Sequence, residues 1–171
     1  IRIRFPFNSE QTAVPGTIAD GTCVAVARTQ GSTLDFINRN AMLKFSLDES
    51  FNDVTKVTVE SAENYISGTY NIEWEGTNPI LGIAYTGRGK TVTLSNDDNS
   101  PLHTGVDYYI VLPPNNNDGG FSVSVTLADG SVLTKTSTKA QAFSSGNIIP
   151  LSKTPLTKAM FVSAQTSGRY A

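Results

Sequence analysis

The sequence predicts an all-β domain folded as a two-sheet antiparallel β-sandwich. The clearest evidence is the run Phe121–Leu127, in which Phe, Val, Val and Leu alternate with Ser and Thr. Because successive side chains of a strand point to opposite faces of a sheet, this run places its apolar residues on one face. About ten such runs follow one another at roughly ten-residue spacing, separated by turn residues. At 171 residues, this pattern is typical of one sandwich domain.

The first predicted strand covers residues 1–7, where Ile1, Ile3, Phe5 and Phe7 alternate with other residues. A polar connection follows and contains Pro15-Gly16, a pair that favours a turn. The next predicted strands cover residues 22–27, 41–47 and 53–60.

A further strand is predicted over residues 65–74, interrupted by Gly68. A glycine within a strand marks either a bulge or a close approach of another backbone, and both readings stay open. Residues 83–85 and 91–94 are predicted to pair, because the link between them has a length common in hairpins.

The second half of the chain continues the same pattern. Residues 106–112 are continuously apolar, which favours a central strand, whereas 113–120 begins with two prolines and is expected to be a surface loop. The pair Asp129-Gly130 between two β-rich runs predicts a hairpin. Residues 146–151 are the last predicted strand, and no amphipathic helix of useful length is expected anywhere. We therefore assign residues 1–152 to the sandwich domain and residues 153–171 to a C-terminal extension.

Composition excludes several function classes. The chain has 13 Lys and Arg, 15 Asp and Glu and a net charge of -2, so it lacks the positive field of a nucleic-acid-binding protein. Its single cysteine, Cys23, excludes an internal disulfide and is expected to be a buried, inert thiol. No apolar stretch approaches the roughly 20 residues needed to cross a bilayer as a helix.

The residues that could carry chemistry are few. His103 is the only histidine and has no nucleophile motif beside it, so a catalytic triad is not expected. Asp97 and Asp98 lack the Gly and Glu positions of a calcium loop. Glu73 and Glu75 are expected to face solvent, with Tyr70, Ile72 and Trp74 toward the core. We predict no enzyme activity, no cofactor and no metal site.

Six segments, taken in order, carry a family resemblance. They are residues 36–47 (F-x-N-x-x-A-x-L-K-F-x-L), 54–59, 66–70 (hydrophobic-x-G-x-Y), 108–113 (Y-Y-x-x-L-P), 121–134 and 146–151. Together they resemble strands of the Bacteroidales fimbrillins, the subunits of type V pili, over residues 20 to 152.

The resemblance implies a transthyretin-like, Greek-key sandwich and a non-enzymatic structural or adhesive role in a cell-surface fimbria. Fimbrillins typically have two such domains, a lipoprotein signal and an N-terminal strand removed by an Arg-directed protease. This chain resembles one domain and shows no lipobox, so attachment to the outer membrane would require a lipid anchor that this chain does not contain. The implied partners are other fimbrial subunits and a host glycan or protein receptor.

The implied mechanism is strand donation, in which an extended segment of one subunit completes a sheet of its neighbour. Candidate donor or edge segments lie at both ends of the chain: Ile1, Ile3, Phe5 and Phe7, and Met160, Phe161 and Val162. Deletion of residues 154–171 is expected to leave a folded domain that assembles poorly.

The alternative function is an extracellular carbohydrate-binding sandwich. It would require an outward aromatic platform built from Trp74 with Tyr70 or Tyr85.

Overall fold

The computed structural model describes residues 3–166. For residues 84, 85 and 163–166 it describes the backbone alone. In chain order the elements are β1 (Ile3–Phe7), β2 (Glu10–Thr12), β3 (Ala25–Val26), β4 (Ile37–Asn38), β5 (Ala41–Ser46), the 3-10 helix η1 (Glu49–Phe51), β6 (Val54–Ser61), β7 (Ser67–Glu75), β8 (Asn78–Gly89), β9 (Thr91–Ser95), β10 (Asp107–Leu112), β11 (Asn115–Asn117), β12 (Phe121–Leu127), β13 (Val132–Ser137), β14 (Gln141–Phe143), β15 (Ile148–Pro150) and the helix α1 (Lys158–Thr166).

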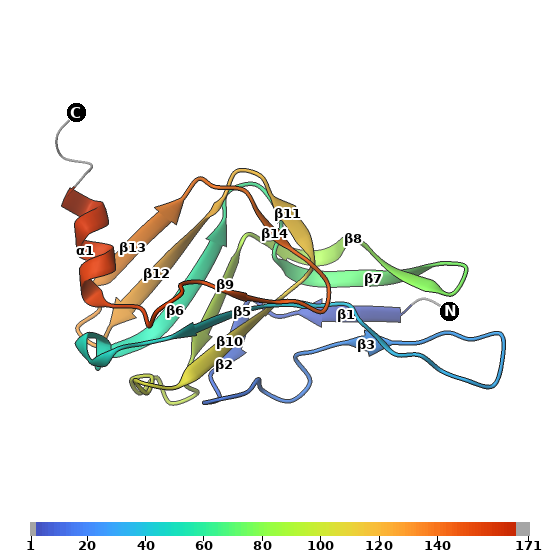
Figure 1. Cartoon of the computed structure of the whole chain (residues 1–171), viewed down its shortest axis with the longest axis horizontal. Coiled ribbons are helices and arrows are strands. Elements are labelled where there is room, and N and C mark those ends of the chain that lie inside the picture. The colour runs from blue at the N-terminus through green and yellow to red at the C-terminus, as the bar shows by residue number, and fades with distance from the viewer. Residues whose placement is uncertain (1–2, 167–171) are drawn as a thin grey trace.

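The body of the molecule is a sandwich of two sheets, which confirms the predicted fold class. One sheet has the order β13-β12-β6-β9-β2 and the other β10-β5-β15 (Figure 1). Their facing side chains form the main core, which includes Leu43, Phe45, Val57, Val59, Leu94, Tyr108, Ile110 and Val125. Two edge pairs, β2 with β9 and β15 with β5, are parallel, whereas the other strand pairs are antiparallel.

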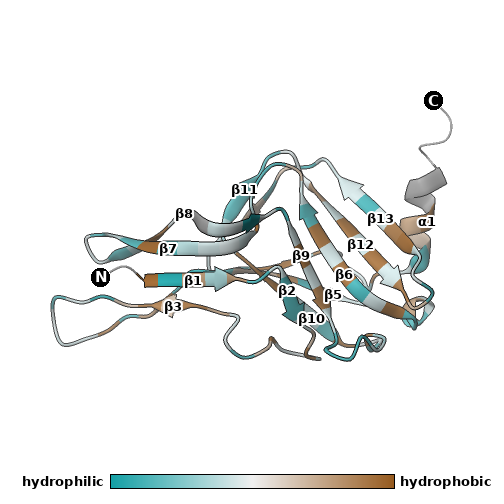
Figure 2. Cartoon of the chain, turned by 180° about the vertical axis from the view of Figure 1, so that it is seen from behind, coloured by the Kyte–Doolittle hydropathy of each residue, from teal (hydrophilic) through white to brown (hydrophobic). Residues whose placement is uncertain are grey.

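The alternating sequence pattern explains the central strands directly. Along β12 the side chains of Val123, Val125 and Leu127 are buried and the residues between them are not. Figure 2 shows the same alternation of apolar and polar colour along β6 and β12. The hairpin predicted at Asp129-Gly130 is confirmed, because β12 pairs with β13 on either side of it.

A second, smaller unit projects from the sandwich as an arm. It consists of the sheet β1-β7-β8 and the short pair β3-β4. Its own apolar cluster contains Phe7, Val24, Val26, Tyr70, Ile72 and Val111. Both readings of Gly68 hold in this arm. The β7 to β8 register shifts at that residue, and a Cβ there would lie 2.9 Å from the Thr86 carbonyl oxygen.

Three local predictions in the strand region are wrong. Residues 106–112 do not form a central strand, because β10 is an edge strand of its sheet. Residues 113–120 are not wholly a loop, because β11 pairs with β14 and Asn117 accepts a 2.6 Å hydrogen bond from the buried Ser61 hydroxyl. The predicted hairpin of 83–85 with 91–94 does not form either. β8 runs on to Gly89 as the partner of β7, and β9 pairs with β6 and β2 in the other sheet.

The sequence analysis did not predict the short α-helix at the end of the described residues. α1 covers nine residues, fewer than the roughly 12–15 that an isolated helix needs to be stable in water. Tertiary packing rather than local propensity must therefore hold it, and Phe161 supplies that packing from within the main core.

Candidate functional site

The N-terminal segment, residues 3–13, forms the edge of two sheets in succession. β1 pairs with β7 in antiparallel register, with Phe7 opposite Gly68. Only two residues separate β1 from β2, which runs parallel to β9 at the edge of the five-stranded sheet. One continuous stretch of chain therefore covers both edges (Figure 1).

This segment buries three side chains, all at odd-numbered positions. Phe7, Gln11 and Ala13 are 2%, 7% and 8% exposed, whereas residues 8–10 between the first two are exposed. Alternate inward side chains along an extended backbone are the arrangement by which one strand completes a sheet.

Phe7 is the largest of these inward side chains. Its ring lies edge-on to Phe5, with 5.3 Å between centroids, and edge-on to Tyr70 at 5.4 Å. It belongs to the apolar cluster of the arm. Burying one side chain of this kind stabilises a fold by roughly 1.5–3 kcal/mol. Withdrawal of β1 would open an apolar groove beside β7.

Gln11 joins the two sheets through its side-chain amide. Its Nε2 donates to the Val111 carbonyl at 2.7 Å, and its Oε1 accepts from the Val111 N–H at 2.9 Å. β10 lies at the edge of its sheet in the pairing order, so this amide occupies hydrogen-bonding groups that a neighbouring strand would otherwise take. The Gly16 N–H donates to the Asp107 carbonyl at 2.8 Å and so occupies a further backbone group on the same edge of β10.

Replacement of Gln11 by leucine should lower the free energy of unfolding by about 2–4 kcal/mol. The substitution leaves the buried N–H and C=O of Val111 unpaired, and each unpaired buried group costs roughly 1–3 kcal/mol. Urea denaturation would measure the loss, with Gln30→Leu on an exposed loop as the matched control. Equal effects of the two substitutions would contradict the role given to the Gln11 amide.

The outer side of β1 is less suited to accepting another strand. Arg4 and Pro6 are exposed there, and Pro6 has no N–H to donate to a ladder. Prolines occur in sheets chiefly on edge strands, with the nitrogen toward solvent. Charged residues and proline on an edge oppose further pairing. Exchange of β1 itself is therefore favoured over addition of a strand beside it.

Tyr70, under β1, gives the arm a dependence on alkaline pH. Burial raises the pKa of Tyr70 to about 12, and its hydroxyl donates to the Tyr65 carbonyl at 2.9 Å. An unfolded tyrosine titrates near 10, so this stabilisation is complete below about pH 10 and is lost as the pH rises toward 12. Thermal unfolding from pH 8 to 11.5 should show a Tyr70→Phe variant less stable at pH 8, with a difference that narrows at high pH. A constant difference would contradict the assignment.

The C-terminal segment closes the opposite edge of the smaller sheet. After β15, the Leu151 N–H donates to the Lys44 carbonyl and the Leu156 N–H to the Ser46 carbonyl, each at 2.8 Å. Leu156 also forms an isolated parallel bridge with Leu47. The chain then enters α1, where the Phe161 ring lies edge-on to Phe51 at 5.5 Å between centroids.

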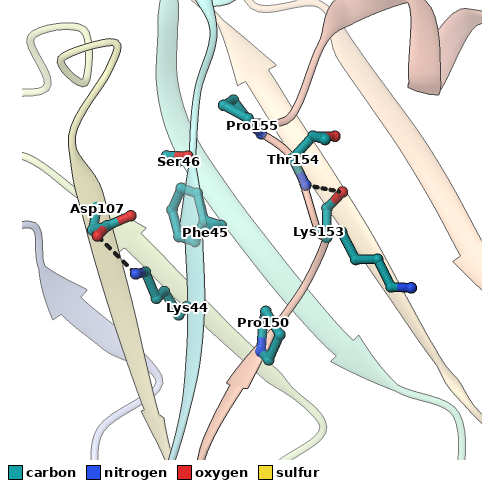
Figure 3. Close-up of a pocket in the computed structure, with 9 residues that line it drawn as sticks. Lys44, Phe45, Ser46, Asp107, Pro150, Lys153, Thr154 and Pro155 are labelled. Atoms are coloured by element: carbon teal, nitrogen blue, oxygen red, sulfur yellow. Dashed lines mark hydrogen bonds and ion pairs between the residues drawn. The ribbon is translucent and has the colours of Figure 1, made fainter.

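A hollow of about 350 Å³ lies where residues 152–155 bow away from β5 (Figure 3). Lys44 pairs with Asp107 at 2.8 Å on its wall. That hydrogen bond, with the charge of Asp107, raises the pKa of Lys44. Figure 3 shows Lys153 directed away from this pair. The hollow marks an interruption in the pairing along β5.

The seven predicted donor or edge residues fall in different environments. Ile1 lies outside the described residues. Ile3 is exposed, Phe5 is half-buried and Phe7 is buried, all on the edge strand β1. In α1, Met160 is half-buried, Phe161 is buried and Val162 is exposed. Strand donation by either end stays a prediction.

The residues considered for catalysis or metal binding have other surroundings. The His103 side chain is exposed, and its backbone N–H donates to the Tyr108 hydroxyl at 2.9 Å. Asp97 accepts a 2.7 Å hydrogen bond from Thr12, and Asp98 caps the turn at Ser100. Hydrogen bonds from Ser100 lower the pKa of Asp98. Within residues 3–166, no group of three metal-ligating side chains is present.

The solvent-facing and core-facing sides of β7 match the prediction. Glu73 and Glu75 are exposed, Tyr70 and Ile72 are buried, and Trp74 is half-buried. The Arg28 guanidinium lies over the Trp74 ring, 5.8 Å from its centroid. The Tyr85 side chain lies outside the described residues. Trp74 and Tyr70 do not form an open aromatic platform.

Cys23 is half-buried rather than fully buried, which corrects the sequence expectation. Burial raises the pKa of its thiol, and a hydrogen bond with Asn40 acts in the opposite direction. No helix in the described part of the chain is long and apolar enough to span a membrane.

Sequence reasoning missed Gln11. The only signal in the sequence is that Gln11 lies in phase with Phe5 and Phe7, and the exposed Ser9 interrupts the inward alternation before it. The prediction of residues 8–20 as a polar connection obscured that phase.

Comparison with known proteins gives structural likeness only. No family model matches the chain, and no curated protein matches it. A proposed cell adhesion protein from Bacteroides uniformis is 18% identical with a TM-score of 0.43, over 70% of this chain and 48% of that one. A proposed cell adhesion protein from Bacteroides ovatus is 14% identical with a TM-score of 0.47, over 74% and 45%. The chain therefore spans about half the length of these two proteins.

Proposed function

We propose that this chain is a non-enzymatic structural or adhesive subunit of a cell-surface fimbria, and that its subunits join by β-strand exchange. One observation carries the proposal: a single N-terminal segment supplies the edge strands of two sheets and buries Phe7, Gln11 and Ala13. Its partners would be other fimbrial subunits. The ordered resemblance of six segments to fimbrillin strands supports the same function.

The placement of the two ends of the molecule favours a fibre. β1 begins at the tip of the arm, and α1 lies at the far end of the sandwich (Figure 1). A head-to-tail contact that uses two different surfaces and does not close into a ring generates an open filament. A subunit that joins neighbours at its two ends would therefore extend along its long axis.

The carbohydrate-binding alternative is less well supported by the same arm. It needs Tyr70 and Trp74 turned outward, but Tyr70 is 8% exposed and Arg28 lies over Trp74. A flat stacking surface for a sugar ring is absent from the described side chains of β7.

Removal of residues 1–13 tests the function. We expect the full chain to be monomeric and the shortened chain to form regular linear oligomers, visible by negative-stain electron microscopy and size-exclusion chromatography. A synthetic peptide of residues 1–13, added in excess, should restore the monomer because it refills both edges. A peptide with Phe7→Ala and Gln11→Leu is the matched control and should fail to restore it. A shortened chain that stays monomeric and folded would refute the proposal.

A further inference from the structure

The arm carries a hollow with a cation on its wall. The hollow has a volume of about 280 Å³ and is lined by Ile3, Ala27, Arg28 and Trp74. The Arg28 guanidinium lies over the Trp74 ring, 5.8 Å from its centroid, and forms no ion pair with another residue of the described range 3–166. An engineered cavity of about 150 Å³ binds benzene, so this hollow is large enough for an aromatic side chain.

The link between β3 and β4 exposes large apolar side chains on the same arm. Leu34 and Phe36 are 55% and 69% exposed, and Asp35 between them also faces solvent. Figure 1 shows this link extending outward beside the turn between β7 and β8. Exposed apolar side chains that gather in one place mark a contact surface for another molecule.

The link offers the two groups that the hollow lacks. Phe36 has an aromatic ring, which packs favourably against the face or edge of an aromatic side chain such as Trp74. Asp35, next to it, has a carboxylate that forms no ion pair within residues 3–166, and guanidinium with carboxylate is a strong hydrogen-bonding pair. Because Phe36 is so exposed, it does not fill the hollow of its own chain.

Both halves of this contact are present on every copy. Arg28 and Asp35 belong to the same link between strands, and Trp74 lies on the same arm. A surface that carries two complementary halves can pair with an identical surface about a two-fold axis, so that each half is used twice. A second copy of this chain is therefore the occupant that the chemistry of the hollow fits.

We propose that two copies of this chain pair through their arms, with the Phe36 ring of each copy in the hollow beside Trp74 of the other. Asp35 of each copy then faces Arg28 of the other. The Arg28 side chain is long and exposed, so its guanidinium can leave the Trp74 ring to the incoming Phe36 and meet the carboxylate. This pairing goes beyond the proposed function and uses surfaces other than the exchange of β1, so either can hold without the other.

The pairing is expected to be weak. Contacts that bury less than about 1,200 Å² in total belong to transient complexes, and the end of one arm is a small surface. The full chain should therefore be monomeric at micromolar concentration and pair measurably only near about 1 mM. Two fibres side by side would present many such contacts at once, and their combined effect would be much stronger. That consequence, unlike the pairing itself, rests on the proposed function.

Charge reversal in full-length chains tests the contact. One variant carries Arg28→Asp and the other carries Asp35→Arg. A pair of identical variants places like charges across the contact at two points, whereas a mixed pair places unlike charges at both. Sedimentation equilibrium should show the mixed pair to be at least about tenfold tighter than either identical pair.

The matched control changes the same charges elsewhere. Asp118→Arg and Lys139→Asp alter exposed residues of the loops before β12 and after β13. Each of these variants should pair with itself as the unchanged chain does, and their mixture should show no preference. This control separates a local contact from a general effect of net charge.

Trp74 locates the contact, because it is the only tryptophan of the chain. Its fluorescence emission should move to shorter wavelength as the unchanged chain is concentrated, since the Phe36 ring of the partner would exclude water from it. Phe36→Ala should remove most of that shift. Val132→Ala, at a position on β13 that is 52% exposed, should leave the shift unchanged.

Each result supports or overturns the pairing. Preference for the mixed pair, together with a Trp74 shift that depends on Phe36, supports it. A chain that is monomeric at about 1 mM, or whose association is insensitive to both charge reversals or to Phe36→Ala, overturns it and leaves strand exchange standing. A Trp74 shift that requires anionic phospholipid vesicles instead of a second copy also overturns it and assigns the hollow to a membrane surface. Loss of the oligomers expected after removal of residues 1–13 would refute the proposed function alone.

Discussion

Gly120→Ala is expected to lower the free energy of unfolding by roughly 2–5 kcal/mol. Gly120 has a φ of +80°, and a Cβ there would lie 1.9 Å from the carbonyl oxygen of Ser137. The substitution adds the cost of a positive φ, about 1–2 kcal/mol, to an overlap that forces the start of β12 away from β13, about 1–3 kcal/mol. Chemical denaturation of the purified variant would measure the loss.

Gly130→Ala is the matched control for this effect. Gly130 has a φ of +85°, and a Cβ at this position would have no neighbouring atom within 4 Å. The Gly130→Ala variant should therefore lose only the free energy that a positive φ costs a non-glycine residue, about 1–2 kcal/mol. If Gly120→Ala and Gly130→Ala destabilise equally, the close approach between Gly120 and Ser137 does not exist in solution.

Phe161→Ala is expected to lower the free energy of unfolding by about 3–5 kcal/mol, the usual cost of removing a buried aromatic side chain. Phe161 is 1% exposed and packs against Phe51. Circular dichroism should also show the loss of α1, because this contact anchors the helix. Val162→Ala, next to it and 49% exposed, should change stability by less than about 1 kcal/mol.

This result would also revise an expectation drawn from sequence. Deletion of residues 154–171 removes Leu156 and Phe161 from the main core, so the shortened chain should be markedly less stable. A Phe161→Ala variant as stable as Val162→Ala would show that the tail packs only loosely, and the sequence expectation of a dispensable tail would then stand.

Strands with a strict period of two could be predicted from sequence, because alternating apolar and polar residues show directly which face of the strand is buried. β12 and the hairpin after it are examples. The prediction failed where tertiary contacts outweigh local pattern. The helical tail depends on Phe161 reaching Phe51, residues far apart in the chain. The pairing of β8 depends on a register shift at Gly68 that sequence alone does not locate.

The candidate site could likewise be predicted from sequence only in part. The sequence identified Ile3, Phe5 and Phe7 as an alternating edge strand, and the structure places them at a sheet edge. It did not indicate that the same segment crosses to a second sheet. Gln11 pairs with Val111, 100 residues away. A contact between residues so far apart has no local sequence pattern, and only the odd-numbered position of Gln11, in phase with Phe5 and Phe7, points to an inward side chain.

In the proposed assembly, the groove beside β7 receives a strand from another subunit. A cryo-electron microscopy map of fibres formed after removal of residues 1–13 would show whether it does. The proposed assembly predicts an extended segment of a neighbouring chain, antiparallel to β7, with an aromatic side chain next to Tyr70. Fibres in which the groove beside β7 is empty, and whose subunits touch only through other surfaces, would contradict it.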